Sequence, residues 1–215
     1  MKTMIIGVVL MTTAMTHAEF SDNFNRANTS GSGSAISKAI GNGWVGQDVR
    51  QWAVKDQKLK SDAGTGNHIY NTNAATLNSP ADNSFVISAL ITLNTSAGTA
   101  YGGLVVNYDS AESNGFVFRI NGEGAVQFLR PNGSQITSGT MAEKFVPNRA
   151  YRMTVSSNAA NNYKLEIFDT VLNKTVYTKT LVNSGGSTRS NGFGGLFVNT
   201  AGIEFDDFTL EAGKR

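Results

Sequence analysis

Three carboxylates near the two ends of the chain are the first candidates for chemistry: Asp22 lies close to the start, and Asp206 and Asp207 lie close to the end. If the strands at the two ends pair, these side chains come near one another. Carboxylates grouped with backbone carbonyls suit Ca²⁺, which takes about 6 to 8 oxygen ligands at flexible geometry. Alternatively, the acids end their strands and accept hydrogen bonds from loop backbone. The pattern leaves both interpretations open.

A second candidate is the pair His68 and Tyr70, which are two residues apart and so share one face of a strand. A polysaccharide lyase uses such side chains to remove the proton at C5 of a uronate, while a cation such as Arg119 neutralises the carboxylate. A single His-x-Tyr pattern is not specific to lyases, so this chemistry is an alternative to be weighed against simple binding.

A third candidate is a set of four polar residues that alternate with apolar ones in the middle of the chain: Asn107, Arg119, Gln127 and Arg152. If their strands belong to one sheet, the four side chains line one face of it. They would then offer donors and acceptors to a hydroxyl-rich ligand. The alternative is the ordinary solvated face that every antiparallel sandwich has.

Composition argues against several other chemistries. The chain has no cysteine, so it forms no disulfide, thiolate metal site or cysteine nucleophile. Its 18 Lys and Arg nearly balance its 16 Asp and Glu. That balance argues against nucleic acid as a partner, because domains that bind nucleic acid carry a basic stripe. The sequence also has no nucleophile elbow for a serine triad and no glycine-rich phosphate loop before a helix.

Period-two alternation of apolar residues indicates the elements that position these side chains. Turn-forming pairs such as Asn121-Gly122 and Asn191-Gly192 separate the runs. The sequence shows no sustained helical repeat, and the pattern predicts about 12 to 14 strands. The fold class that follows is an all-β, two-sheet antiparallel β-sandwich. The alternating runs lie at 85–93, 104–108, 116–120, 126–128, 151–155, 163–167, 196–198 and 203–205.

The first eighteen residues resemble a secretory leader. Lys2 gives a positive start, an apolar stretch follows from Met4 to Met15, and Thr16-His17-Ala18 offers small residues for cleavage. The apolar stretch is shorter than the roughly 20 residues of a membrane-spanning helix. We therefore expect a signal peptide over 1–18 and one domain over 19–215. We also expect a secreted or periplasmic monomer without a membrane span.

Four short patterns follow one another along the chain. They are Phe20-Ser21-Asp22-Asn23-Phe24-Asn25-Arg26, Gly41-Asn42-Gly43-Trp44, Gln51-Trp52-Ala53-Val54 and Ile203-Glu204-Phe205-Asp206-Asp207-Phe208. In this order they resemble the bacterial laminin-G-like jelly rolls of the concanavalin A-like lectin/glucanase superfamily. The resemblance covers nearly all of residues 19–215. It implies that the first and last strands lie side by side and that a glycan binds on the concave sheet.

The resemblance also implies roles for particular residues. Many members of the superfamily carry a structural Ca²⁺, so Asp22 and Asp206 are expected as its ligands, and Trp44 and Trp52 are expected in the core. The glycoside hydrolases of the superfamily carry Glu, Asp and Glu on one face of a strand. Here the nearest match, Glu204 and Asp206, lacks the second glutamate. Retaining hydrolysis needs two carboxylates, so the sequence does not favour that activity.

From these observations we expect an exported, non-catalytic, lectin-like module that binds a polysaccharide or other glycan through the four polar residues. Two alternatives stay open. One is a small polysaccharide lyase that acts on a uronate-containing glycan through His68 and Tyr70. The other is a structural or adhesive surface protein.

Overall fold

Residues 18–28, 40, 42–46, 52–61, 67–71, 84–109, 114–130, 133–157, 162–182 and 192–212 are described by the structure, which is a computed structural model. They form fifteen strands. The expected leader therefore lies outside the described residues except for Ala18, where the first strand begins.

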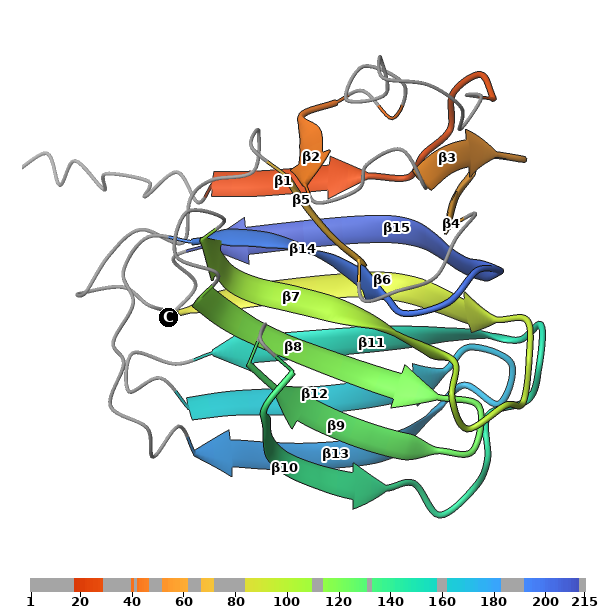
Figure 1. Cartoon of the computed structure of the whole chain (residues 1–215), viewed down its shortest axis with the longest axis vertical. Helices are drawn as coiled ribbons and strands as arrows, with labels where there is room; N and C mark the ends of the chain where they lie inside the picture. Colours follow the sequence, from red (N-terminus) through yellow and green to blue (C-terminus); the bar gives the residue numbers. More distant parts are fainter. Residues whose placement is uncertain are drawn as a thin grey trace, which may run out of the picture.

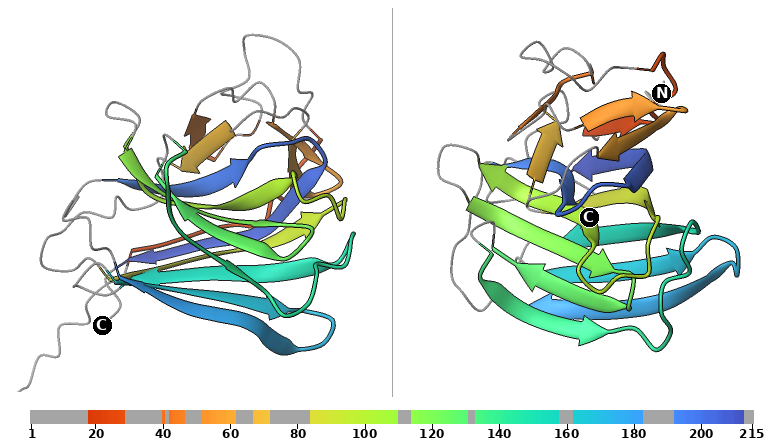
Figure 2. Two further views of the ribbon diagram at one scale, coloured as in Figure 1. Left: turned by 60° about the horizontal axis from the view of Figure 1, so that its bottom comes forward. Right: turned by 45° about the vertical axis from the view of Figure 1, so that its right-hand side comes forward.

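The strands form two antiparallel sheets that lie face to face as two layers (Figures 1 and 2). Sheet A has eight strands, in the order β13 (Lys174–Val182), β12 (Asn162–Asp169), β11 (Ala150–Ser157), β6 (Phe85–Leu93), β15 (Ile203–Ala212), β4 (Lys58–Ser61) and β3 (Trp52–Lys55), with β1 (Ala18–Asp22) paired to β15. Sheet B has seven strands, in the order β10 (Gln135–Thr140), β9 (Ala125–Leu129), β8 (Asn114–Asn121), β7 (Tyr101–Asp109), β14 (Phe193–Val198), β5 (Asn67–Asn71) and β2 (Trp44–Gly46).

These segments form strands because apolar side chains recur at every second residue and must reach one shared interior. In β11 every second side chain from Tyr151 to Ser157 is buried, and the alternate ones are half-buried. Phe85, Phe116 and Phe205, which mark three of the predicted strands, are at most 7% exposed. The predicted fold class, an all-β two-sheet sandwich, is confirmed.

The interior between the sheets is centred on aromatic rings from both layers. The ring of Tyr163 in sheet A lies 5.3 to 6.3 Å, between centroids, from those of Phe85, Phe116, Phe118 and Phe128. Three of these four partners belong to sheet B. Burial of such rings supplies a large part of the stability of a fold without disulfides, at roughly 25 cal/mol per Å² of apolar surface.

Register shifts occur at several strand pairs, and two of them carry a left-handed residue. The first of these two bulges corrects an expectation from the sequence. Asn107 has a φ of 51°, and the register of β7 with β8 shifts just after Val106. The shift turns the Asn107 side chain inward, where its Nδ2 donates to the hydroxyl of Tyr163 at 3.3 Å. Tyr108 consequently joins an apolar cluster on the outer face of sheet B. The expectation that Asn107 lines an outer face is therefore wrong.

The second bulge lies in β15, where Asp207 has a φ of 45° and the register with β6 shifts between Asp206 and Thr209. Strict alternation would place Phe205 and Phe208 on opposite faces, yet both are fully buried. The inserted residue therefore serves packing, because it lets two aromatic rings enter the same interior.

The two ends of the chain meet as the resemblance implies. β1 pairs with β15 in register from Ala18 opposite Ala212 to Asp22 opposite Phe208 (Figure 1). Along the opposite side of the sandwich, the outermost strands β13 and β10 are joined by Lys179, whose Nζ donates to the carbonyl oxygen of Ser138 at 2.8 Å. Among the described residues, no helix has the length and apolarity that crossing a bilayer requires.

Substitution at Tyr163 tests how much its ring and its hydrogen bond contribute to the stability of the core. Burial raises the pKa of this hydroxyl to about 12, so it is neutral and accepts the bond from Asn107. Tyr163→Phe keeps the ring but leaves a buried amide without its acceptor, and should cost about 1 kcal/mol. Tyr163→Ala should cost about 3 to 5 kcal/mol. Urea unfolding measures both, and a Tyr163→Phe protein as stable as wild type would contradict the role of this bond.

Candidate functional site

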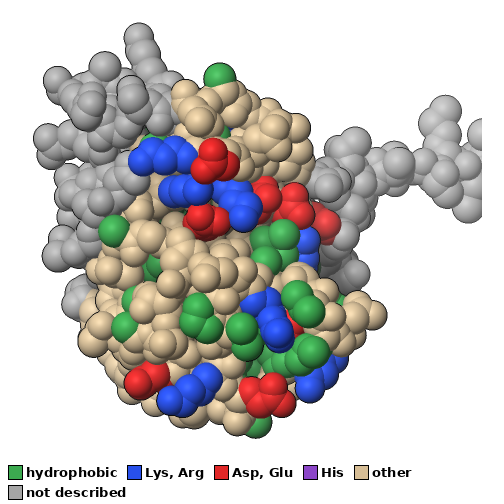
Figure 3. All heavy atoms as spheres, turned by 90° about the vertical axis from the view of Figure 1, so that its right-hand side faces the viewer, with side chains coloured by type: hydrophobic (Ala, Val, Ile, Leu, Met, Phe, Trp, Pro, Cys, Tyr) green, Lys and Arg blue, Asp and Glu red, His purple; other side chains and the backbone are tan. Residues whose placement is uncertain are grey.

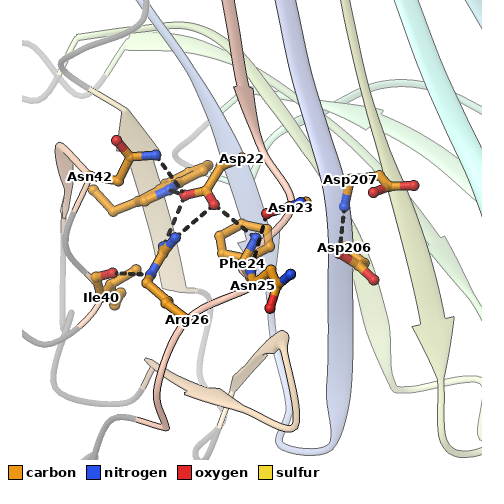
Figure 4. Close-up of polar contacts among 10 residues, drawn as sticks. Asp22, Asn23, Phe24, Asn25, Arg26, Ile40, Asn42, Asp206 and Asp207 are labelled. Carbon is orange, nitrogen blue, oxygen red and sulfur yellow. Dashed lines mark hydrogen bonds and ion pairs between the residues drawn. The ribbon is translucent and has the colours of Figure 1, made fainter.

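The Asp22 carboxylate lies at the end of β1 in a closed ring of donors (Figure 4). Its Oδ1 accepts hydrogen bonds from the Phe24 amide at 2.8 Å and from Nη1 of Arg26 at 2.7 Å. Its Oδ2 accepts from Nη2 of Arg26 at 2.9 Å, from Nε1 of Trp44 at 2.8 Å and from Nδ2 of Asn42 at 3.2 Å. Asp22 is 4% exposed.

These contacts decide the charge state of Asp22. Burial alone would raise the pKa of the carboxyl, but the hydrogen bonds from Arg26, Trp44, the Phe24 amide and Asn42 outweigh it, and the pKa is lowered. The carboxylate is thus ionised and stabilised by a bidentate guanidinium. Trp44 takes part through its indole N–H while its ring packs 4.9 Å from that of Phe208. Its placement in the core agrees with the expectation, as does that of the fully buried Trp52.

The Asp22 environment does not fit a Ca²⁺ ligand. Five donors already occupy its two oxygens. A cation would also lie beside the charge of Arg26. Asp206 belongs to the adjacent strand and accepts from the Asp207 amide at 2.8 Å (Figure 4). Burial and the nearby Asp207 raise the pKa of Asp206. In the part of the chain that the structure describes, no three acidic or histidine side chains gather at one point.

An open groove of about 510 Å³ runs beside Asp22 along β1 and β15. Its lining includes Arg152 and Asp207, joined by an ion pair of 3.3 Å in which the side chains are 36% and 48% exposed. Exposed pairs of this kind contribute little to stability. Arg152 comes from β11 and therefore belongs to sheet A. The expectation that it shares a face with Arg119 and Gln127 is wrong, because those two belong to sheet B.

Arg119 and Gln127 face each other across β8 and β9 on the outer face of sheet B. Nε of Arg119 donates to Oε1 of Gln127 at 2.8 Å. The guanidinium carbon lies 4.2 Å from the ring centroid of Tyr101 and 5.5 Å from that of Phe197. We call Tyr101, Arg119, Gln127 and Phe197 the arginine patch.

The register explains why the arginine patch forms. One row across sheet B pairs Ser138, Gln127, Arg119, Gly103 and Phe197 in succession. Gly103 is required in this row, because a Cβ there would lie 1.9 Å from the carbonyl oxygen of Phe118. The absence of a side chain at this place also leaves the strand between Arg119 and Phe197 bare, so the guanidinium can lean over it toward the rings.

Tyr101 and Phe197 are the members of the patch that the sequence analysis missed. The alternation signal was present for both. Leu196 and Val198 point inward, so Phe197 between them points outward. Leu104 and Val106 point inward in the same way, so Tyr101 points outward. Aromatic residues in apolar strands are ordinarily assigned to the core. Only the order of strands shows that Tyr101, from β7, and Phe197, from β14, meet an arginine from β8.

The pair His68 and Tyr70 lies in β5, and the backbone register sets His68 opposite Phe197 and Tyr70 opposite Gly195. Their side chains lie outside the described part of the structure. His68 is therefore in the same row as Arg119, but three strands away. Strands are spaced about 4.8 Å apart, so the two backbones are separated by about 14 Å.

The charged side chains of the sheet A strands are largely paired with one another. Glu204 accepts from Nζ of Lys58 at 3.1 Å and from Nζ of Lys60 at 3.0 Å. Burial would raise the pKa of Glu204, but its bonds to the two lysines lower it. Figure 3 shows basic and acidic side chains adjoining one another on one side of the molecule. A Glu204 carboxylate that two lysines hold in its ionised form is unsuited to proton transfer.

No family model and no curated protein match this sequence. Several solved structures have a similar fold. The carbohydrate-binding module CBM66 from Bacillus subtilis is 19% identical with a TM-score of 0.59, over 79% of this chain and 96% of that one. Arcelin-5, a lectin-like defence protein from Phaseolus vulgaris, is 8% identical with a TM-score of 0.61, over 92% and 100% of the two chains. Lectin II from Ulex europaeus is 9% identical with a TM-score of 0.54, over 80% and 92%.

The lowered pKa of Asp22 predicts how stability responds to acid. The unfolded carboxyl, with its ordinary pKa of 3.8, takes up a proton before the folded one does. The stabilisation from this group is therefore complete above that value and is lost as the pH falls through the lower, folded pKa. Asp22→Asn should cost about 3 kcal/mol at neutral pH, because Arg26 loses its partner, and should make stability below pH of about 5 less steeply dependent on pH.

The matched control for Asp22→Asn is Asp56→Asn, since Asp56 is 77% exposed and its ion pair with Lys60 is on the surface. This change should alter the free energy of unfolding by no more than about 0.5 kcal/mol. Urea titrations at a series of pH values measure both variants. Equal costs for the two substitutions would contradict the role of the buried ring of donors.

Metal removal tests the calcium expectation separately. Since the donors around Asp22 leave no oxygen for a cation, the thermal midpoint should be the same in EDTA and in millimolar Ca²⁺. A midpoint that rises with Ca²⁺ would show that a cation binds the folded state, because ligands of the native state stabilise it by mass action. That result would mean that the ring of donors at Asp22 opens to admit the ion or that Ca²⁺ binds elsewhere.

Proposed function

We propose that this chain, which has the concanavalin A-like jelly-roll fold, is a non-catalytic carbohydrate-binding module that binds a glycan at the arginine patch. The carbohydrate-binding module and the lectins described above share the fold, and they support the class of ligand. The leader-like start of the sequence further supports a secreted or periplasmic place of action.

The observation that carries the proposal is the setting of Arg119. Its guanidinium lies against Tyr101 and Phe197 and is fixed by Gln127. Arg119 and Tyr101 are both partly exposed, so they can meet the two sides of a sugar, whose hydroxyls take hydrogen bonds and whose C–H faces pack on apolar surface. Phe197 is only 4% exposed and supports the guanidinium from beneath. Holding the donors in place before binding also reduces the entropy lost on association.

The spacing within sheet B favours binding over lyase chemistry. Proton removal and carboxylate neutralisation act on the same sugar unit, yet the backbones of His68 and Arg119 lie about 14 Å apart by strand spacing. A lyase would therefore need two side chains to span that distance between them, whereas binding needs only the arginine patch. A lyase would release an unsaturated uronate, and we expect no rise in the ultraviolet absorbance of that product with any uronate polymer.

Two arginine variants test the site. Arg119→Ala removes the polar centre of the patch, and we expect at least about tenfold weaker glycan binding, because hydrogen bonds from charged groups are each worth about 1.5 to 3 kcal/mol. The loss of its contacts with the rings should cost only about 1 kcal/mol of stability. Glycan-array retention followed by isothermal titration measures the affinity, and urea unfolding measures the stability.

Arg152→Ala is the matched control, because Arg152 is also a partly exposed arginine but belongs to the opposite sheet. It should bind like wild type. Equal losses in the two variants, or a loss in Arg152→Ala alone, would contradict the assignment of the site to sheet B. Retention of no glycan by wild type would favour the alternative of a structural or adhesive surface protein.

A further inference from the structure

The strands of sheet B contain two residues that carry a full charge at neutral pH, Arg119 and Asp109. The two are far apart. Asp109 lies six residues along β7 from Gly103, which faces Arg119, and this corresponds to about 20 Å of extended strand. Within the described strands of sheet B, Arg119 is consequently the one basic residue, and the one acidic residue lies at the far end of β7.

Among the described residues, no contact compensates the charge of Arg119. Of its five N–H groups, Nε–H binds Gln127, and none of the described carboxylates forms an ion pair with the other four. The outer face around it is formed by Val105, Val117 and Phe197, which are at most 4% exposed. Desolvation accordingly lowers the pKa of Arg119.

Three of the other four described arginines have an aspartate partner, and the fourth, Arg130, is exposed just after β9. Arg26, Arg149 and Arg152 form ion pairs with aspartates at 2.7, 2.8 and 3.3 Å respectively. These three arginines lie in sheet A or in the loops next to its strands. A guanidinium that is partly withdrawn from water and lacks an anion costs free energy, and an anionic ligand returns that free energy on binding.

We propose that Arg119 binds the carboxylate of a uronic acid, so that the glycan recognised by the patch is an acidic polysaccharide; this inference rests on the proposed function. The terminal nitrogens Nη1 and Nη2 present a fork that matches the two oxygens of a carboxylate. The rings and Gln127 hold this fork in one orientation. A neutral sugar would leave this partly buried charge unpaired, so the site selects against it.

Chemically matched ligands test this inference without relying on a variant. Polygalacturonate, alginate and hyaluronan are offered to the full chain in affinity gels, each beside its carboxyl-reduced form, in which CH₂OH replaces the carboxylate. An oligosaccharide of the retained polymer and its reduced form are then titrated. We expect the acidic form to bind at least about tenfold more tightly, since a bidentate, partly desolvated ion pair is lost on reduction.

Arg119→Lys keeps the positive charge but removes the fork and most of the contact with the rings. It should fold as wild type does and should lower the preference for the acidic form by about tenfold or more. Arg152→Ala should leave that preference unchanged. A higher salt concentration should weaken the binding of the acidic form and leave the binding of the reduced form unchanged, because only the acidic form binds through charge.

The outcomes separate this inference from the proposed function. If neutral glycans are retained and the acidic polymers are not, or if the reduced form binds as well as the acidic one, the carboxylate inference is overturned and glycan binding at the patch stands. If an acidic polymer binds and Arg119→Lys keeps the full preference, the carboxylate is bound elsewhere and the inference is likewise overturned. If no glycan binds, both fall.

Discussion

The structure depends on one constraint: the inner faces of two sheets share a single apolar interior, and every strand must send alternate side chains into it. Tyr163 of sheet A packs among Phe116, Phe118 and Phe128 of sheet B. Because Phe118 and Phe128 point inward, their neighbours Arg119 and Gln127 must point outward and lie side by side. The position of the arginine patch is thus a by-product of core packing. The bulges at Asn107 and Asp207 show the same constraint, since at each of them an inserted residue lets a further side chain point inward.

Much of this arrangement could be predicted from the sequence. Period two located the strands and placed Phe85, Phe116 and Phe205 in the interior, where they are buried. It also placed Arg119 and Gln127 outside it. Asn107 could not be placed, because a left-handed residue shifts the alternation after it and leaves the local pattern looking regular. Arg152 was assigned to the wrong sheet, since a strand's own residues do not show which neighbours it pairs with.

The environment of Asp22 was the hardest feature to predict. Its position near the paired chain ends is apparent from the sequence, but a carboxylate that binds a cation and one that binds a guanidinium look alike there. Arg26 lies four residues away, whereas Trp44 and Asn42 arrive from more distant segments. These hydrogen bonds hold the end of β1, which pairs with β15, and connect β1 to the start of β2. Polar contacts here do what a disulfide does in many secreted domains.

The bridge from Lys179 to Ser138 has a consequence beyond stability. Outermost strands expose unpaired N–H and C=O groups, which can recruit a strand from another molecule and extend the sheet into a fibril. β13 and β10 form such margins on the same side of the sandwich, and Lys179 occupies a carbonyl of one while it places a charge on the other. One lysine thereby discourages self-association through both margins when many copies lie close together.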